Sequence, residues 1–333
     1  MNEESVMVQS RYSRGALYCV IATVSWGAMF PVMGHALTHV DPFIFASLRY
    51  GLAVVAFVAL LLWMEGRDGL TLKGERAFLA WLFGTAGFAG FGFLAFLGQQ
   101  LAGKDGALTA SIISATMPML TLLVNWVLRK AVPPVYSFLF ILMSFVGVVL
   151  VITKGDVLGL VQQPHNAANI LIVLGVLCWV LYTVGATFFP AWSAIKYTTM
   201  TTLLGLTSVF AINGFLYVSD LVPVPSADAI ASVVPDLMYM AFAAGFVGVL
   251  SWNSGNKILT PVNGMLFINL VPLTAFVISA IQGLVPTPAQ VVGAGLTTGA
   301  LILNNLYLRY RGIASVSQIG RPGVTNGPSA QKV

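Results

Sequence analysis

Polar and aromatic side chains inside long apolar stretches are the residues of this chain best suited to bind a small solute. Trp26 and Trp179 each lie near the middle of such a stretch, where an indole offers a flat apolar wall and one N–H donor. Arg49 lies about two turns into another stretch, and its guanidinium can hold a carboxylate through two parallel hydrogen bonds. A charge at that depth is costly in lipid, so the alternative is that Arg49 extends to the outer boundary or pairs with helix-end carbonyls.

Amide and phenol groups in the apolar stretches form a second set of candidates, because they need hydrogen-bond partners inside a dry helix bundle. The set consists of Tyr182, Gln99, Gln100, Asn253 and Asn269. A bound solute is one partner that would satisfy them, and a neighbouring helix is the other. We therefore expect the substrate-binding site to draw on these residues together with the two tryptophans and the arginine.

Several kinds of chemistry are not indicated. All eleven carboxylates lie in tails, loops or the ends of apolar stretches, so no proton relay is visible within the membrane. Cys19 and Cys178 have no metal-ligand spacing, and we expect neither a metal site nor a cofactor. The run from Gly98 to Lys104 has the spacing of a phosphate-binding loop, but Asp105 stands where Ser or Thr would bind magnesium. The sequence thus gives no support for ATP-driven pumping.

The elements that must position these side chains are ten apolar stretches of about 20 to 23 residues, each long enough to cross a bilayer as a helix. With 58% hydrophobic and 8% charged residues, the chain has too little polar surface to cover a soluble globule of 333 residues. The predicted spans are residues 16–37, 43–64, 77–99, 106–128, 134–153, 168–190, 197–218, 236–255, 261–282 and 287–308. We predict an all-α integral membrane protein with ten transmembrane helices.

The basic residues predict how the helices are oriented. If the spans alternate in direction, only Arg49, Lys104 and Lys154 fall away from the side that carries the two termini, which leaves thirteen of the sixteen Lys and Arg residues on that side. Basic loops are retained in the cytoplasm, so we expect both termini to be cytoplasmic, in a bacterial inner (plasma) membrane. This placement also accounts for the net charge of +5 without nucleic-acid binding.

The two halves of the chain repeat each other at an offset of about 153 residues. The matching pairs are Trp26 with Trp179, Pro118 with Pro272 and Gly147 with Gly299. Because each half has an odd number of spans, the second half enters from the opposite side, which gives two inverted five-helix repeats around a central cavity. The expected segments are an N-terminal cytoplasmic tail at 1–15, the first repeat at 16–153, an external loop at 154–167, the second repeat at 168–308 and a disordered cytoplasmic tail at 309–333.

Pro118 and Pro272 are the candidates for helix kinks and gating. Each proline removes the hydrogen bond to a carbonyl four residues earlier, on Ser114 and Ile268 respectively. The freed carbonyls lie near mid-membrane, where a solute or water can use them. We therefore predict bends in the fourth and ninth spans.

A family resemblance rests on these residues and their neighbours. The residues that carry it in the second half are Trp252, Asn253, Gly255 and Lys257, followed by Asn269, Leu270, Val271 and Pro272. Supporting matches in the first half are Trp26, Gly27, Pro42, Arg49 and Pro118. Together they resemble EamA-type carriers of the drug/metabolite transporter superfamily over residues 16–310. The resemblance implies ten helices in two inverted repeats, a central cavity, and export or exchange of small metabolites such as amino acids.

The chain departs from that family pattern at the ends of the fourth and ninth spans. Such carriers often end these helices with Gly-Glu, whereas this chain has Arg129 and Lys130, then Gly283 and Leu284. Gating contacts made by those carboxylates are therefore not expected here.

The function predicted from the sequence is secondary transport. We expect a small polar or amphipathic metabolite, neutral or zwitterionic, to be exported by alternating access. The expected partners are the small-molecule solute and the lipid bilayer, and the chain acts as a monomer or homodimer. The alternative is a membrane-embedded enzyme acting on lipid or isoprenoid substrates, which would need paired Asp or His residues at the membrane surface.

Overall fold

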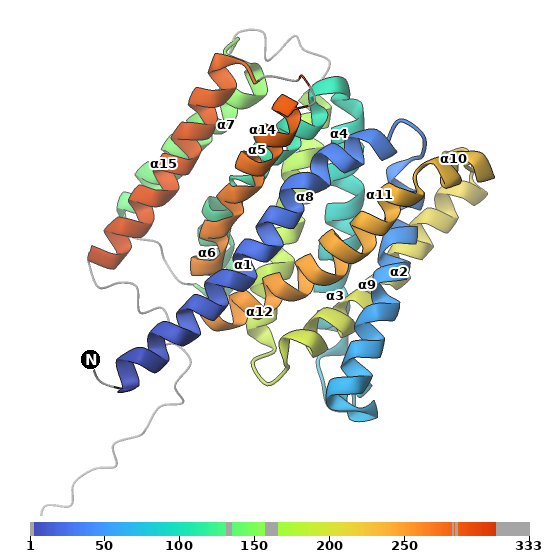
Figure 1. The fold of residues 1–333 in the computed structure, drawn as a ribbon, viewed down its shortest axis with the longest axis horizontal. Coiled ribbons are helices and arrows are strands. Elements are labelled where there is room, and N and C mark those ends of the chain that lie inside the picture. The colour runs from blue at the N-terminus through green and yellow to red at the C-terminus, as the bar shows by residue number, and fades with distance from the viewer. Residues whose placement is uncertain (1–2, 131–134, 157–165, 282, 284–285, 311–333) are drawn as a thin grey trace, which may run out of the picture.

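The computed structural model is a bundle of long helices that run roughly along one direction (Figure 1). It describes residues 3–130, 135–156, 166–281, 283 and 286–310. Within these residues the chain forms helices and no strand. Six helices are long and apolar enough to cross a bilayer, and two further helices bent by 49° would together form a seventh span. The remaining three predicted spans coincide with helical segments, but ten crossings stay a prediction.

The first half of the chain supplies five predicted spans, of which the third and fourth are divided into shorter segments. Their elements are α1 (Glu3–Ala36), α2 (Pro42–Glu65), α3 (Ala77–Gly84), η2 (Thr85–Ala95), α4 (Phe96–Leu101), α5 (Gly106–Ser114), α6 (Met117–Arg129) and α7 (Val135–Thr153). Asp41 fixes the start of α2, because its Oδ1 accepts hydrogen bonds from the backbone N–H groups of Phe43 at 2.8 Å and Ile44 at 2.9 Å. Pro42 suits the first helical turn, where its missing donor has no partner to lose.

The second half is built in the same way. Its elements are α8 (Asn166–Gly185), η5 (Ala186–Phe188), α9 (Ala194–Val218), α10 (Ala227–Ser232), α11 (Val234–Met238), η6 (Tyr239–Gly248), α12 (Val249–Leu259), α13 (Pro261–Gly264), η7 (Met265–Asn269), α14 (Leu270–Ile281) and α15 (Pro288–Tyr310). Ser193 caps α9, because its Oγ accepts a hydrogen bond from the backbone N–H of Lys196 at 3.0 Å.

The helices of the two halves exchange partners as two-fold-related repeats require. The first helix of the first half, α1, packs against α12 and α14 of the second half. The first helix of the second half, α8, packs against η2 and α6 of the first half. The equivalent helices α2 and α9 contact each other directly, and so do α7 and α15. Figure 1 shows α7 and α15 side by side at one edge of the bundle, with the start of α1 and the end of α15 on the same side.

Irregular helical segments also occur at equivalent places in the two halves. The third span of each half contains a π-helix, η2 in the first and η6 in the second. The fourth span is interrupted in each half: α5 and α6 meet at a 49° bend, and η7 is a 3₁₀ segment between α13 and α14. Because π-helices are rare and cluster at functional sites, their paired occurrence marks the region where the repeats face each other.

Close backbone contact holds the repeats together. A Cβ atom added to Gly84 in α3 would lie 2.0 Å from the carbonyl oxygen of Thr201 in α9, so only glycine allows this approach. On the outside of the bundle, large apolar side chains are exposed. They include Val55, Phe78, Leu142, Phe210 and Phe215. Such a surface suits contact with lipid tails, where every backbone polar group is satisfied within the helices.

The segment predicted as an N-terminal tail, residues 1–15, is helical from Glu3 onward, and the apolar span within α1 begins at Ser13. The sequence from Glu3 to Arg14 contains neither Pro nor Gly, so nothing in it ends the helix before the membrane. Most of the predicted C-terminal tail, at 311–333, and most of the predicted inter-repeat loop, at 157–165, lie outside the described residues.

Candidate functional site

A central cavity lies between the two repeats, at the middle of the spans. Its lining residues are Trp26, Met29, Phe30, Arg49, Tyr50, Phe91, Ser114, Met117, Trp179, Ala244, Gly245, Val249, Ile268 and Val271. The volume is about 30 Å³, enough for about two water molecules. Both halves contribute to the wall, including η2, η6 and the interrupted fourth spans, so movement of one repeat against the other would change the size of the cavity.

Arg49 is the only charged residue among those that line the central cavity. Its side chain is 3% exposed, and its guanidinium carbon lies 4.1 Å from the ring centroid of Tyr50 and 4.9 Å from that of Phe96. The guanidinium also donates a hydrogen bond to the Tyr50 hydroxyl, while the Nε atom has no hydrogen-bond partner. Of the two alternatives for Arg49, the structure places it in the cavity wall instead of at the outer boundary.

No carboxylate neutralises Arg49 in the described part of the chain. The ion pairs there are His35 with Asp236, Lys154 with Asp105 and Lys196 with Glu75. The ring faces of Tyr50 and Phe96 offset part of the cost of burying the guanidinium, because their π-electrons attract a cation. The cavity therefore presents a net positive charge in an otherwise uncharged wall.

Four aromatic side chains form a layer at the cavity. Trp26 lies edge-on to Trp179 with ring centroids 5.2 Å apart, and Trp252 lies 5.1 Å from Trp26. Tyr182 is 5.0 Å from Trp179 and continues the layer away from the cavity. The Trp26 indole donates a hydrogen bond to the carbonyl of Ala244 in η6 at 2.9 Å, so its orientation is fixed. We call Trp26, Trp179, Trp252 and Tyr182 the aromatic layer.

The side chains of Tyr182 and Asn253 are hydrogen-bonded to each other. The Asn253 amide donates hydrogen bonds to the Tyr182 hydroxyl at 2.7 Å and to Thr198 Oγ1 at 2.8 Å. Asn253 also lines a second, larger cavity, of about 270 Å³, formed by η5, α9, α12 and α13. Since Val249 lines the central cavity and Asn253 stands one helical turn further along α12, the two cavities are about 6 Å apart along that helix. The aromatic layer lies between them.

The remaining predicted site residues do not reach the central cavity, or their side chains lie outside the described part. Gln99 donates a hydrogen bond to the carbonyl of Phe30 at 2.7 Å, and Gln100 donates one to that of Leu37 at 2.9 Å. Both amides thus bind the backbone of α1. Asn269 is the last residue of η7, but its side chain lies outside the described residues.

The two candidate hinge prolines lie next to breaks in their helices. Pro118 is in the first turn of α6, directly after the break that follows Ser114. Pro272 is in the first turn of α14, after the 3₁₀ segment. The Ser114 hydroxyl donates a hydrogen bond to the carbonyl of Ala110 at 2.8 Å, and Ser114 itself lines the cavity. The predicted bends therefore fall where the fourth spans border the central cavity.

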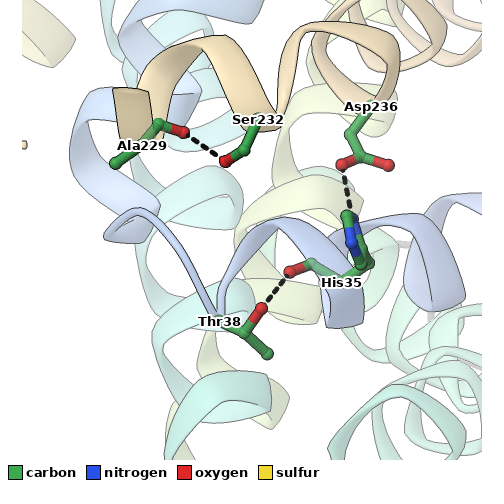
Figure 2. Close-up of polar contacts among 5 residues, drawn as sticks. All are labelled: His35, Thr38, Ala229, Ser232 and Asp236. Carbon is green, nitrogen blue, oxygen red and sulfur yellow. Dashed lines mark hydrogen bonds and ion pairs between the residues drawn. The ribbon is translucent and has the colours of Figure 1, made fainter. Parts of the chain in front are cut away.

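A polar contact ties the two halves together at the end of the bundle that carries His35. His35, in the last turn of α1, lies 2.7 Å from Asp236 in the first turn of α11 (Figure 2). Thr38 Oγ1 donates a hydrogen bond to the His35 carbonyl at 2.7 Å. We call this end of the bundle the His35 end. The opposite end of the bundle, where α12 ends and Lys257 lies, is the Lys257 end. The contact between His35 and Asp236 lies at the first end, while the larger cavity lies toward the second.

Several lining residues were not predicted from the sequence. Tyr50 follows Arg49 directly, but nothing in the sequence shows that its ring would lie over the guanidinium of its neighbour. Phe91, Met117 and Ile268 carry no polar group that would single them out in an apolar span. A metal-binding cluster of three or more His, Cys, Asp or Glu residues is also not present among the residues that the structure describes.

Comparisons with known proteins agree with this architecture. The EamA-like transporter family matches the chain twice, over residues 13–153 and 166–306. The uncharacterized transporter YrdR of Bacillus subtilis strain 168 is 41% identical over 312 residues, which cover 93% of this chain and 97% of that protein. The uncharacterized transporter YyaM of the same organism is 29% identical over 271 residues, 81% of this chain and 86% of that one.

A solved crystal structure shares the fold. It superimposes with a TM-score of 0.62 over 90% of this chain and 99% of its own, at 17% sequence identity. Both repeats of the present chain are thus covered by a known arrangement of helices.

Proposed function

The chain belongs to the EamA-like transporter family, and from this premise we propose that it is a secondary carrier that exports a small amphipathic metabolite by alternating access. The proposed substrate carries one carboxylate, as an amino acid does. The observation that carries this proposal is the buried Arg49, which lines the central cavity without a carboxylate partner among the described residues.

The physical argument concerns the cost of a buried charge. A guanidinium stays charged in a protein, and removing it from water without a counter-ion costs several kcal/mol. A substrate carboxylate would supply the missing charge and accept hydrogen bonds in the planar geometry that Arg favours. The uncharged remainder of the wall favours a solute with no second net charge, and the tryptophans of the aromatic layer suit an apolar body.

Alternating access follows from the size of the central cavity. At about 30 Å³ it is too small for a metabolite, so the walls must move apart for a solute to bind. The breaks between α5 and α6 and between α13 and α14 supply places where the wall can bend. We propose that the repeats rock about the cavity, and that the contact between His35 and Asp236 opens when the solute leaves.

The direction of transport rests on the expected orientation. With both termini in the cytoplasm, the Lys257 end faces the cytoplasm and the His35 end faces outward. The larger cavity at the Lys257 end then supports this end as the entry for solute. We propose that solute enters there and is released at the His35 end.

Transport by the purified protein in proteoliposomes tests the proposal. Vesicles loaded with radiolabelled L-phenylalanine are compared with vesicles loaded with its carboxamide, which keeps the ring and the amine but lacks the carboxylate. The proposal expects exchange of the acid and not of the amide, and loss of exchange in Arg49→Met. Arg67→Met, at an exposed position in the short 3₁₀ helix after α2, serves as the matched control. If a wider panel of carboxylates is not exchanged, or if Arg49→Met exchanges them like the unaltered protein, the proposal is wrong.

A further inference from the structure

The cavity at the Lys257 end contains unused hydrogen-bonding groups. We call this cavity the vestibule, and define it by Thr187, Trp192, Tyr197, Asn253, Asn256 and Lys257. All of its lining comes from the second repeat, and with a volume of about 270 Å³ it is close to the lower limit for small-molecule sites. It is therefore a chamber separate from the central cavity, on the other side of the aromatic layer.

Three buried polar atoms of the vestibule residues have no partner: the indole Nε1 of Trp192, the Oδ1 of Asn253 and the Oδ1 of Asn256. Trp192 is 3% exposed and each asparagine is 4% exposed, so bulk water does not satisfy these atoms. Leaving a buried donor or acceptor unpaired costs about 1–3 kcal/mol each. Such a concentration of unpaired atoms in one cavity indicates a place for a ligand.

The orientations of the two asparagines are fixed by their other bonds. The Asn253 amide nitrogen is bound to Tyr182 and Thr198, and the Asn256 amide nitrogen donates to the carbonyl of Trp252 at 2.9 Å. Each side chain thus keeps its oxygen free to accept. The Asn256 oxygen lies against Gly264, so Asn253 is the better placed acceptor of the pair.

The hydrogen-bond donors that line the vestibule include one ammonium group, that of Lys257. The Lys257 ammonium donates a hydrogen bond to the backbone carbonyl of Trp192, the residue whose indole N–H is unpaired. Lys196 adds a second cation, with its Nζ 5.3 Å from the Trp192 ring, but it also lies 4.0 Å from Glu75. No carboxylate lines the vestibule itself, and Glu65, the carboxylate bound to the lining residue Ser193, accepts a hydrogen bond from the Ser193 hydroxyl. The donor side of this chamber therefore suits an anionic group.

The first repeat carries an amide at the position equivalent to Asn253. When Pro118 is aligned with Pro272, Gln99 is the counterpart of Asn253. The Gln99 amide binds the carbonyl of Phe30 within the packed helices at the His35 end, and its Oε1 is also unpaired. The two amides therefore have different surroundings: Gln99 is bound to the backbone of α1, whereas Asn253 borders the vestibule.

We propose that the vestibule is a loading site that takes a small carboxylic acid bearing a neighbouring amine or hydroxyl donor, before that solute passes the aromatic layer. The Lys257 ammonium and the Trp192 indole N–H hold the carboxylate, and the Asn253 amide oxygen accepts from the donor group. The identification of this ligand with the transported solute rests on the proposed function. The charge selectivity of the vestibule does not, and it is measurable without transport.

The test measures how the vestibule discriminates between charged thiol reagents. Thr187→Cys places a thiol in the lining, and the purified protein reacts with an anionic sulfonatoethyl and a cationic trimethylammonioethyl methanethiosulfonate. Rates are normalised to a free thiol in solution, and the unaltered protein, with its own Cys19 and Cys178, gives the background. The anionic reagent is expected to react about tenfold faster in normalised terms, because one nearby ammonium attracts one reagent and repels the other.

Substitutions of Lys257 test whether its ammonium causes the preference for the anionic reagent. Lys257→Gln is expected to remove the preference, Lys257→Arg to keep it, and Lys73→Gln, at an exposed loop position, to leave it unchanged. Trp192→Phe keeps an aromatic ring but removes the indole donor, and should lower the preference about threefold. If Lys257→Gln does not fold, the arginine and phenylalanine variants decide. Equal normalised rates in Thr187→Cys, or a preference that survives in a folded Lys257→Gln protein, would overturn the proposal.

This result is independent of whether solute is transported. If the vestibule prefers the anionic reagent but the protein exchanges no carboxylate in proteoliposomes, the proposed carrier function is wrong and the charge selectivity of the vestibule is still supported. Exchange that depends on Arg49, without any preference in the vestibule, would do the reverse.

Discussion

Replacing Arg49 by Met is expected to stabilise the protein while abolishing transport. An arginine at the centre of a membrane helix costs about 2.5–3.5 kcal/mol, which is the upper bound for Arg49 about two turns into α2, and its unpartnered Nε adds about 1–3 kcal/mol. Against this, the ring faces of Tyr50 and Phe96 return about 1 kcal/mol each, and the hydrogen bond to the Tyr50 hydroxyl returns about 1.5 kcal/mol. Because the costs exceed the returns, methionine of similar length should gain about 1–2 kcal/mol.

The corresponding change in melting temperature is a rise of about 2–4 °C, measured by heating the purified protein and following the loss of monodisperse material. For transport, removal of a charge-assisted hydrogen bond worth about 1.5–3 kcal/mol should weaken binding of a carboxylate about 10- to 150-fold. The control is Arg67→Met, which should change neither quantity. A melting temperature several degrees lower in Arg49→Met, with exchange intact, would show that the guanidinium is a structural group and refute the reasoning.

Three further substitutions test other parts of the structure. Trp26→Phe removes the indole donor that bonds the carbonyl of Ala244 in η6 at 2.9 Å. Thermal denaturation should show a loss of about 1–3 kcal/mol in the free energy of unfolding, whereas an unchanged melting temperature would contradict that hydrogen bond. Gly84→Ala brings a methyl group within 2.0 Å of a backbone oxygen of α9, and should lower the free energy of unfolding by more than about 2 kcal/mol or abolish folding. Gly214→Ala, with open space around it, is the control and should leave stability unchanged. Equal effects of the two substitutions would contradict the close approach. Asp236→Asn weakens the contact with His35, so exchange should become faster with a stability loss below about 1 kcal/mol, since His35 is 59% exposed; slower exchange would show that the contact does not hold that end closed.

The sequence predicted the membrane-spanning architecture because length and apolarity of a stretch decide whether it can cross lipid. The all-helical fold and the membership of the EamA family are confirmed, and the repeat that pairs Pro118 with Pro272 agrees with the paired helix breaks. Trp26 and Trp179 were expected at similar depths, and the structure brings their rings to 5.2 Å. Depth alone does not fix the direction of a side chain around its helix, so the contact between the two rings was not predicted.

The roles of the buried amides were beyond sequence reasoning. Gln99 and Asn253 have the same chemistry and equivalent positions, yet Gln99 binds the backbone of α1 while Asn253 binds Tyr182 and borders the vestibule. The difference depends on which helix faces each amide, a tertiary fact that no local pattern contains. The vestibule was not predicted, because Trp192 and Lys257 have the sequence surroundings of ordinary residues in a turn and at a helix end.

The π-helices η2 and η6 set the angular register of the spans that contain them. A residue in an α-helix advances by about 100° around the axis, so each wide turn rotates everything beyond it relative to a regular helix. Removing one residue from η6 would swing Asn253 by about that angle, out of the chamber that it borders and toward a neighbouring helix or the lipid. The same deletion in η2 would carry Gln99 off the backbone of α1. The spacing of a single residue in each half therefore determines which side chains a passing solute meets.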